Sequence, residues 1–96
     1  MSKGYWIARV DVADTEQYKL YVDANATPFA AFGAKFLVRS GRFEAPEGTS
    51  RSRNVVIEFP SYQDALACYR CPEYQEAMNL RLAVSTGDLI IVEGYE

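Results

Sequence analysis

Among the polar residues, Arg39, Asn54 and Glu58 fall on segments that we expect to be interior strands. Charged groups are seldom buried without a partner, so an arginine on such a strand needs an anion. Strand alternation places Asn54 and Glu58 on the same face, beside the strand that carries Arg39. Two interpretations follow. Arg39 and Glu58 form a structural ion pair, or they are catalytic, with Arg39 clamping an anion and Glu58 acting as a general base.

A second group of candidate residues lies on the expected helices. Asn25 falls on an apolar helix face, where a buried amide needs hydrogen-bond partners. Tyr74 and Arg81 are two turns apart on one helix face, and Tyr69 shortly precedes them. These residues either pack as ordinary core and surface groups or, with Asn54, line a pocket for a planar, acidic small molecule whose charge Arg81 offsets.

The sequence contains no histidine, which excludes Ser-His and Cys-His mechanisms and His-ligated haem. Two cysteines are too few for a structural zinc site, and there is neither an acidic metal-site cluster nor a glycine-rich phosphate loop. Cys68-x-x-Cys71 lies at the end of one helix and the start of the next, so we interpret the pair as a buried thiol and a helix cap rather than a redox motif. We therefore expect no metal and no cofactor.

The composition is that of one globular domain, residues 1–96, with 49% hydrophobic and 24% charged residues. The net charge is −3 and there is no basic stripe, so we expect no nucleic-acid partner. No apolar run reaches membrane-spanning length, and MSKGYWIARV lacks the apolar segment of a signal peptide. These features predict a cytoplasmic protein without a membrane partner.

Short runs of β-branched and aromatic residues predict strands at residues 5–12, 35–40, 54–59 and 89–92. Gly41 permits a bend after which residues 42–44 continue the second strand, and Gly87-Asp88 reads as a turn before the last.

Capping patterns predict where the helices begin and end. Asp14 with Gln17 starts a helix near residue 15, Pro28 should kink or interrupt it, and Gly33 should cap it. Ser61 opens a second helix, which Cys71-Pro72 breaks and restarts. The order βαββαβ predicts an α+β, ferredoxin-like fold, with a four-stranded antiparallel sheet and its helices on one face.

The expected strands are apolar on both faces, although helices cover only one. Trp6 and Ile7 point to opposite faces, and residues 89–92 are apolar throughout. In a chain this short, the natural cover for the second face is another copy of the same chain. The pattern therefore predicts a homodimer whose sheets pack face to face.

Four segments, GYWIARVDV, RNVVIEFPSY, CPEY and IVEGYE, resemble the domain-of-unknown-function 1330 family. The resemblance runs from Gly4 to Glu96 and is specific in order and spacing, with one departure at Cys71, where the family usually has serine before the proline. It implies the dimeric α/β barrel fold and no established activity. The same fold serves cofactor-free monooxygenases, haem-degrading enzymes, lactone isomerases and stress-induced proteins.

Two functions therefore stay open. The protein binds a small organic molecule, aromatic or acidic, between sheet and helices, or it is a cofactor-free enzyme of monooxygenase or isomerase type. In the enzyme, Arg39 holds the substrate anion and Glu58 or a tyrosine transfers the proton. Pocket volume separates the two, because a site for a drug-sized molecule holds on the order of 300 Å³ or more, whereas a nearly closed pocket favours a non-catalytic protein.

Overall fold

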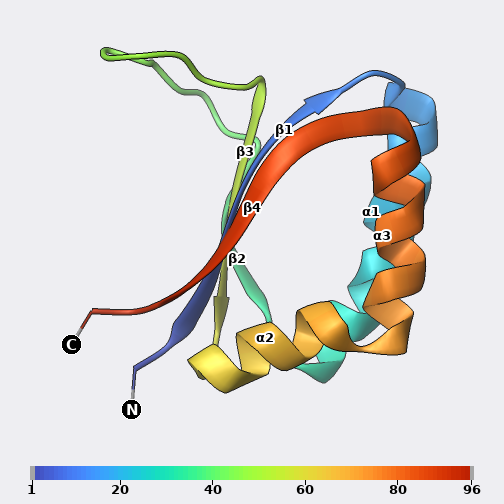
Figure 1. Ribbon diagram of the computed structural model, residues 1–96, viewed down its shortest axis with the longest axis vertical. Coiled ribbons are helices and arrows are strands. Elements are labelled where there is room, and N and C mark those ends of the chain that lie inside the picture. Colours follow the sequence, from blue (N-terminus) through green and yellow to red (C-terminus); the bar gives the residue numbers. More distant parts are fainter. Residues whose placement is uncertain (1, 96) are drawn as a thin grey trace.

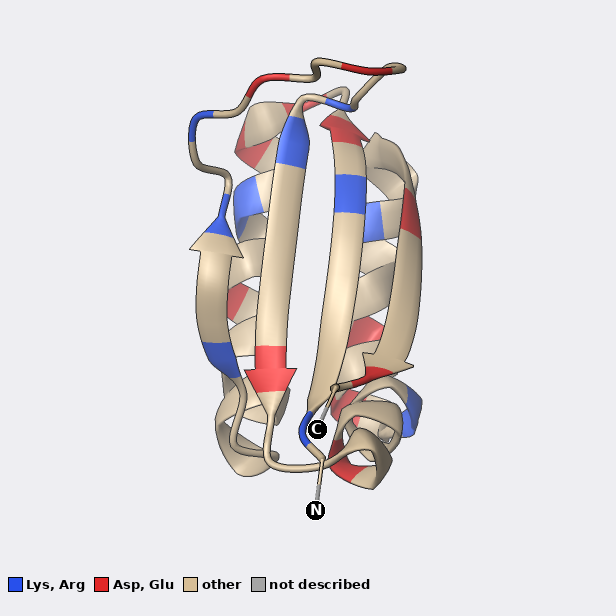
Figure 2. Ribbon diagram, turned by 90° about the vertical axis from the view of Figure 1, so that its left-hand side faces the viewer, with Lys and Arg blue, Asp and Glu red and all other residues tan. Residues whose placement is uncertain are grey.

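The four strands form one antiparallel sheet in the order β2-β3-β1-β4 (Figure 1). The structure is a computed structural model that describes residues 2–95. Its strands are β1 (Gly4–Val12), β2 (Lys35–Arg39), β3 (Arg53–Phe59) and β4 (Ser85–Glu93), and its helices are α1 (Thr15–Ala31), α2 (Tyr62–Arg70) and α3 (Pro72–Val84). All three helices lie on one side of the sheet, and the other side is bare (Figures 1 and 2). The predicted α+β, ferredoxin-like arrangement is confirmed, with the second helical segment divided into α2 and α3.

The core lies between the sheet and the helices and is centred on Trp6 of β1. Alternation turns Trp6, Val10 and, on β3, Ile57 toward the helices, where all three are buried. The Trp6 ring packs edge-on against Phe29 and Tyr74, with centroids 5.2 and 4.9 Å away. Its Nε1 donates a hydrogen bond of 2.8 Å to a carbonyl of α2, so the indole is both buried and satisfied.

The helices begin where the capping patterns predicted. The Asp14 carboxylate accepts a hydrogen bond from the backbone N–H of Gln17 at the start of α1, and the Ser61 hydroxyl does the same for the third residue of α2. Cys71 caps α3 through its sulfur, which lies 3.4 Å from the Tyr74 nitrogen, ahead of a proline at the first helical position.

The other cysteine, Cys68, is fully buried, and burial raises the pKa of its thiol to about 12. It therefore stays a protonated, unreactive thiol at neutral pH.

The end of α1 confirms one prediction and corrects another. Gly33 follows the helix at a φ of 73°, which favours glycine, and the next N–H closes the turn on the Phe29 carbonyl, 2.9 Å away. Pro28 does not interrupt α1, which continues to Ala31. Pro28 lacks the N–H that would bond a carbonyl one turn earlier, and its ring is buried in the core.

Two predicted connections are wrong. Gly87-Asp88 is not a turn, because β4 begins at Ser85 and Gly87 pairs with Val10 of β1. A Cβ at Gly87 would lie 2.5 Å from a backbone oxygen of β1, so the glycine permits close strand pairing rather than a turn. Residues 42–44 do not continue β2, which ends at Arg39 and leads into a long loop.

Candidate functional site

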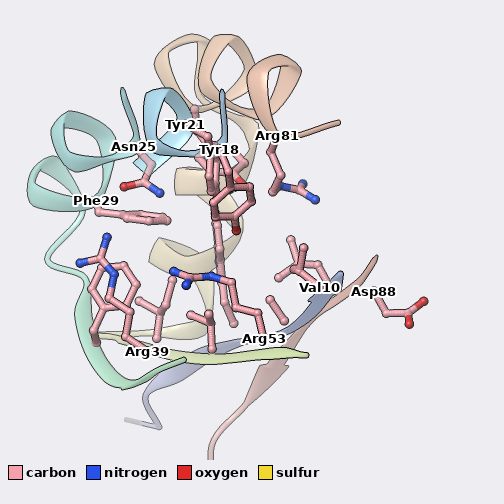
Figure 3. A pocket seen from close by; sticks show the side chains of 16 residues that line it. Val10, Tyr18, Tyr21, Asn25, Phe29, Arg39, Arg53, Arg81 and Asp88 are labelled. Atoms are coloured by element: carbon pink, nitrogen blue, oxygen red, sulfur yellow. The ribbon is translucent and has the colours of Figure 1, made fainter. Parts of the chain in front are cut away.

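A small cavity lies between the inner face of the sheet and the helices α1 and α3 (Figure 3). The volume of the cavity is about 30 Å³. This volume has room for one small polar group. A site for a drug-sized molecule is far larger, on the order of 300 Å³ or more. Most of the lining is aromatic or aliphatic, and three arginines and one amide interrupt it.

Arg39 reaches this cavity because β2 contains a bulge. The register shifts between Phe36 and Val38, so that Leu37 is an extra residue opposite β3. Unbroken alternation from Phe36 would turn Arg39 to the outer face, but the bulge returns it to the inner face, opposite Val55. There its guanidinium carbon lies 4.0 Å from the centroid of the Phe36 ring, a cation–π distance.

Arg53 extends into the cavity from the first position of β3 (Figure 3). Its guanidinium carbon lies 5.2 Å from the centroid of the Tyr18 ring. Its Nε is buried without a hydrogen-bond partner among residues 2–95. Burial raises the pKa of the Tyr18 hydroxyl, and the Arg53 charge acts in the opposite direction.

Arg81 enters from α3, with its guanidinium carbon 5.7 Å from the centroid of the Tyr21 ring. The hydroxyls of Tyr21 and Tyr74 lie 2.9 Å apart and share one hydrogen bond. Burial raises the pKa of Tyr74, the proximity of Tyr21 adds to the rise, and Arg81 opposes it. The phenol is therefore a neutral hydrogen-bonding group at neutral pH and a poor proton acceptor.

The electrostatic balance at the cavity is positive. None of the three arginines forms an ion pair with an acidic residue of the described chain. Asp88, the acidic residue in the lining, points away from the cavity (Figure 3) and accepts a 3.1 Å hydrogen bond from Arg51. Asn25, only 4% exposed, faces the cavity from α1. The arrangement suits a small anion with a second polar atom beside it.

Four of the seven predicted site residues meet at this cavity: Asn25, Arg39, Tyr74 and Arg81. Tyr69 lies outside it, with its hydroxyl 3.3 Å from the sulfur of Met78. The roles of these residues in binding stay predictions.

The predicted pairing of Arg39 with Glu58 is wrong. Alternation along β3 turns Asn54 and Glu58 to the bare face of the sheet, away from the cavity. There Glu58 accepts hydrogen bonds from Lys3 at 3.1 Å and from the Tyr5 hydroxyl at 3.4 Å. Arg39 also lies on an edge strand rather than in the interior of the sheet.

Sequence reasoning missed Arg53, Tyr18 and Tyr21 as members of the site. The signal for Arg53 was present, since it precedes Val55 by two residues in a strand whose alternate positions face the core. The strand was predicted to begin at residue 54, one residue late, so Arg53 was left out of it.

The described residues contain no cluster of three or more His, Cys, Asp or Glu side chains that could hold a metal ion. Nor is any helix of this part of the chain long and apolar enough to cross a membrane.

Solved structures share the fold at low sequence identity. A protein of unknown function from Rhodopseudomonas palustris is 18% identical, with a TM-score of 0.75 over 99% of this chain and 84% of that one. SnoaB, a cofactor-independent oxygenase from Streptomyces nogalater, is 12% identical, with a TM-score of 0.66 over 100% and 96% of the two chains. A dimeric ferredoxin-like protein of unknown function from Thermobifida fusca is 17% identical, with a TM-score of 0.63 over 99% and 92%.

No curated protein matches the chain in sequence. The model of a family described as a domain of unknown function, DUF1330, matches residues 3–95. This match agrees with the resemblance in the four sequence segments, and the chain belongs to the DUF1330 family.

Proposed function

We propose that this protein binds a small organic anion and holds its acidic group in the cavity between the sheet and the helices α1 and α3. The observation that carries the proposal is the set of three arginines around one small cavity, none paired with an acidic residue of the described chain. A carboxylate or phenolate would supply the missing counter-charge. Arginine binds planar oxyanions through two parallel hydrogen bonds, and exclusion of water strengthens them.

The apolar walls favour a planar ligand. Phe29 and Phe36 line the cavity beside Tyr18, so a flat acidic group such as a carboxylate would lie against aromatic rings. The buried amide of Asn25 offers a donor and an acceptor to a carbonyl or hydroxyl next to the acid. The ligand class is therefore an aromatic or conjugated organic acid.

We also propose that the protein is a homodimer in which the second copy covers the bare face of the sheet, as in the dimeric α/β barrel. Figure 2 shows that charged residues lie mostly toward the strand ends and leave the middle of this face uncharged. Large apolar side chains are exposed on the strands: Leu37, Val38, Ile90 and Val92. An apolar surface of this kind marks an interface. The dimeric Thermobifida fusca protein of the same fold supports a second copy as the cover.

We place the protein in the cytoplasm. Cys68 and Cys71 are both free thiols, which fits a reducing compartment. A net charge of −3 speaks against a nucleic-acid partner.

The fold shared with the cofactor-independent oxygenase SnoaB favours a second candidate function, an oxygenase without a cofactor. In such a reaction an activated methylene carbon loses two hydrogens and gains one oxygen atom of O₂, the other leaves as water, and the substrate supplies all four electrons. No carboxylate points into the cavity from the described chain. Such a substrate would therefore have to lose its first proton to water, and the arginines would stabilise its anion.

The test is calorimetric titration with benzoate and with its neutral counterpart benzamide. We expect benzoate to bind and benzamide not to bind, and we expect Arg81→Met to weaken benzoate binding at least tenfold. Arg42→Met, on the exposed loop, is the matched control and should bind as the parent does. Equal binding of the two compounds would contradict the proposal. Uptake of O₂ with aromatic ketones that carry an activated methylene, measured on the same proteins, tests the second candidate.

A further inference from the structure

A second hollow, the β4 groove, lies on the helix side of the sheet between α2, the end of α3 and β4. Its lining combines apolar side chains with two arginines: Leu66, Tyr69, Leu82, Leu89 and Ile91 with Arg70 and Arg81, beside Gly87. Its volume is about 570 Å³, against about 30 Å³ for the cavity. The groove is therefore the larger space and the cavity the more enclosed one.

The groove and the cavity share part of their walls. Arg81 and Leu89 line both. Arg81 thus lies where the two spaces meet, with its guanidinium group over the Tyr21 ring on the cavity side. The groove is therefore the space next to the cavity along Arg81 and Leu89.

The volumes require such a division. About 30 Å³ accommodates an acidic group but not the ring or chain that carries it. Leu82 is 56% exposed at the groove and has apolar surface to bury against a ligand. Arg70 adds a second positive charge to the groove lining.

We infer that the ligand is an elongated organic acid, with its acidic group in the cavity and an apolar ring or chain in the β4 groove. This inference rests on the proposed function, since it extends the same site. It predicts that affinity rises with the length of the apolar part. Each methylene that the groove buries should strengthen binding by up to about fourfold.

The experiment is a calorimetric titration with benzoate, 3-phenylpropanoate and 5-phenylpentanoate. We expect the dissociation constant to fall at least tenfold from the first acid to the last. Leu82→Gln should remove most of this gain and weaken the binding of benzoate less than that of the longer acids. Leu82→Ala should remove a smaller part. Leu20→Gln, at an exposed leucine of α1 that lines neither space, is the matched control and should behave as the parent does.

Equal affinities along the series would overturn the inference and leave the proposed function intact, because the acidic group would still bind. Equal effects of the Leu82 and Leu20 variants would also overturn it, because the apolar part of the ligand would then lie outside the groove. So would a groove filled by the second copy in the dimer, because affinity would then not depend on ligand length. Failure of all three acids to bind would overturn the proposed function as well.

Discussion

Arg53 lies over the ring of Tyr18, with its guanidinium carbon 5.2 Å from the ring centroid and its Nε buried without a partner among the described residues. A buried N–H that forms no hydrogen bond costs on the order of 1–3 kcal/mol. The aromatic contact returns part of this energy, about 0.5–2 kcal/mol. An arginine with a buried, unpaired N–H is suited to bind an incoming anion.

The first prediction concerns this arginine. Arg53→Met keeps an apolar stem against Tyr18 and removes the unpaired N–H, so the melting temperature should stay the same or rise slightly. Benzoate binding should weaken at least tenfold, because one donor and one positive charge are lost. Calorimetry and thermal denaturation of the same preparation measure both effects. A large fall in melting temperature would instead mean that Arg53 serves mainly the stability of the fold.

The second prediction concerns Gly87. An alanine Cβ there would lie 2.5 Å from the Arg9 carbonyl oxygen and 3.0 Å from the Val10 Cα, and neither backbone atom can move freely. Gly87→Ala should therefore lower the free energy of unfolding by about 1–3 kcal/mol in urea denaturation. Gly41→Ala is the control, because its Cβ would meet no atom within 4 Å. Equal effects of the two variants would contradict the close pairing of β1 and β4.

Local patterns in the sequence predicted most of the fold. Runs of β-branched and aromatic residues located the strands, and the caps at Asp14, Ser61 and Cys71 located the helix starts, because these signals depend on neighbouring residues only. Gly87 was misread because a glycine needed for close strand pairing has the same local signature as a glycine in a turn. The backbone of β1 that requires it is more than 70 residues away in sequence.

The site was less accessible to sequence reasoning. Arg39 was singled out from the sequence and lines the cavity. Glu58 was predicted to be its partner because the faces of two strands cannot be matched without their register. The bulge at Leu37, which turns Arg39 inward, is set by pairing with β3 and leaves no clear trace in KFLVR. The positive cavity arises when β2, β3 and α3 each contribute one arginine.

The third prediction is a pH dependence. The pKa of Tyr74 is raised by burial, so in the folded protein this phenol stays protonated above about pH 10, where tyrosines of the unfolded chain ionise. The unfolded state then binds fewer protons, and stability falls as pH rises beyond that point. In Tyr74→Phe the fall should be shallower.

At pH 7 the same variant should lose about 1 kcal/mol, because Tyr21 loses its hydrogen-bond partner. Urea denaturation from pH 7 to 11 measures both effects. Parallel curves for the parent and the variant would mean that Tyr74 ionises as freely in the folded protein as in the unfolded one.

The last prediction concerns the bare face of the sheet. Ile90 is 56% exposed there and pairs with Ile7 of β1, so a second copy packed on this face would bury both side chains. Ile90→Lys would place a charge in that interface and should weaken dimerisation at least a hundredfold, since an unpaired buried charge costs several kcal/mol. Leu20→Lys, on α1 and away from this face, should leave the dimer intact. Sedimentation at micromolar concentration distinguishes these outcomes, and a monomeric parent protein would refute the dimer itself.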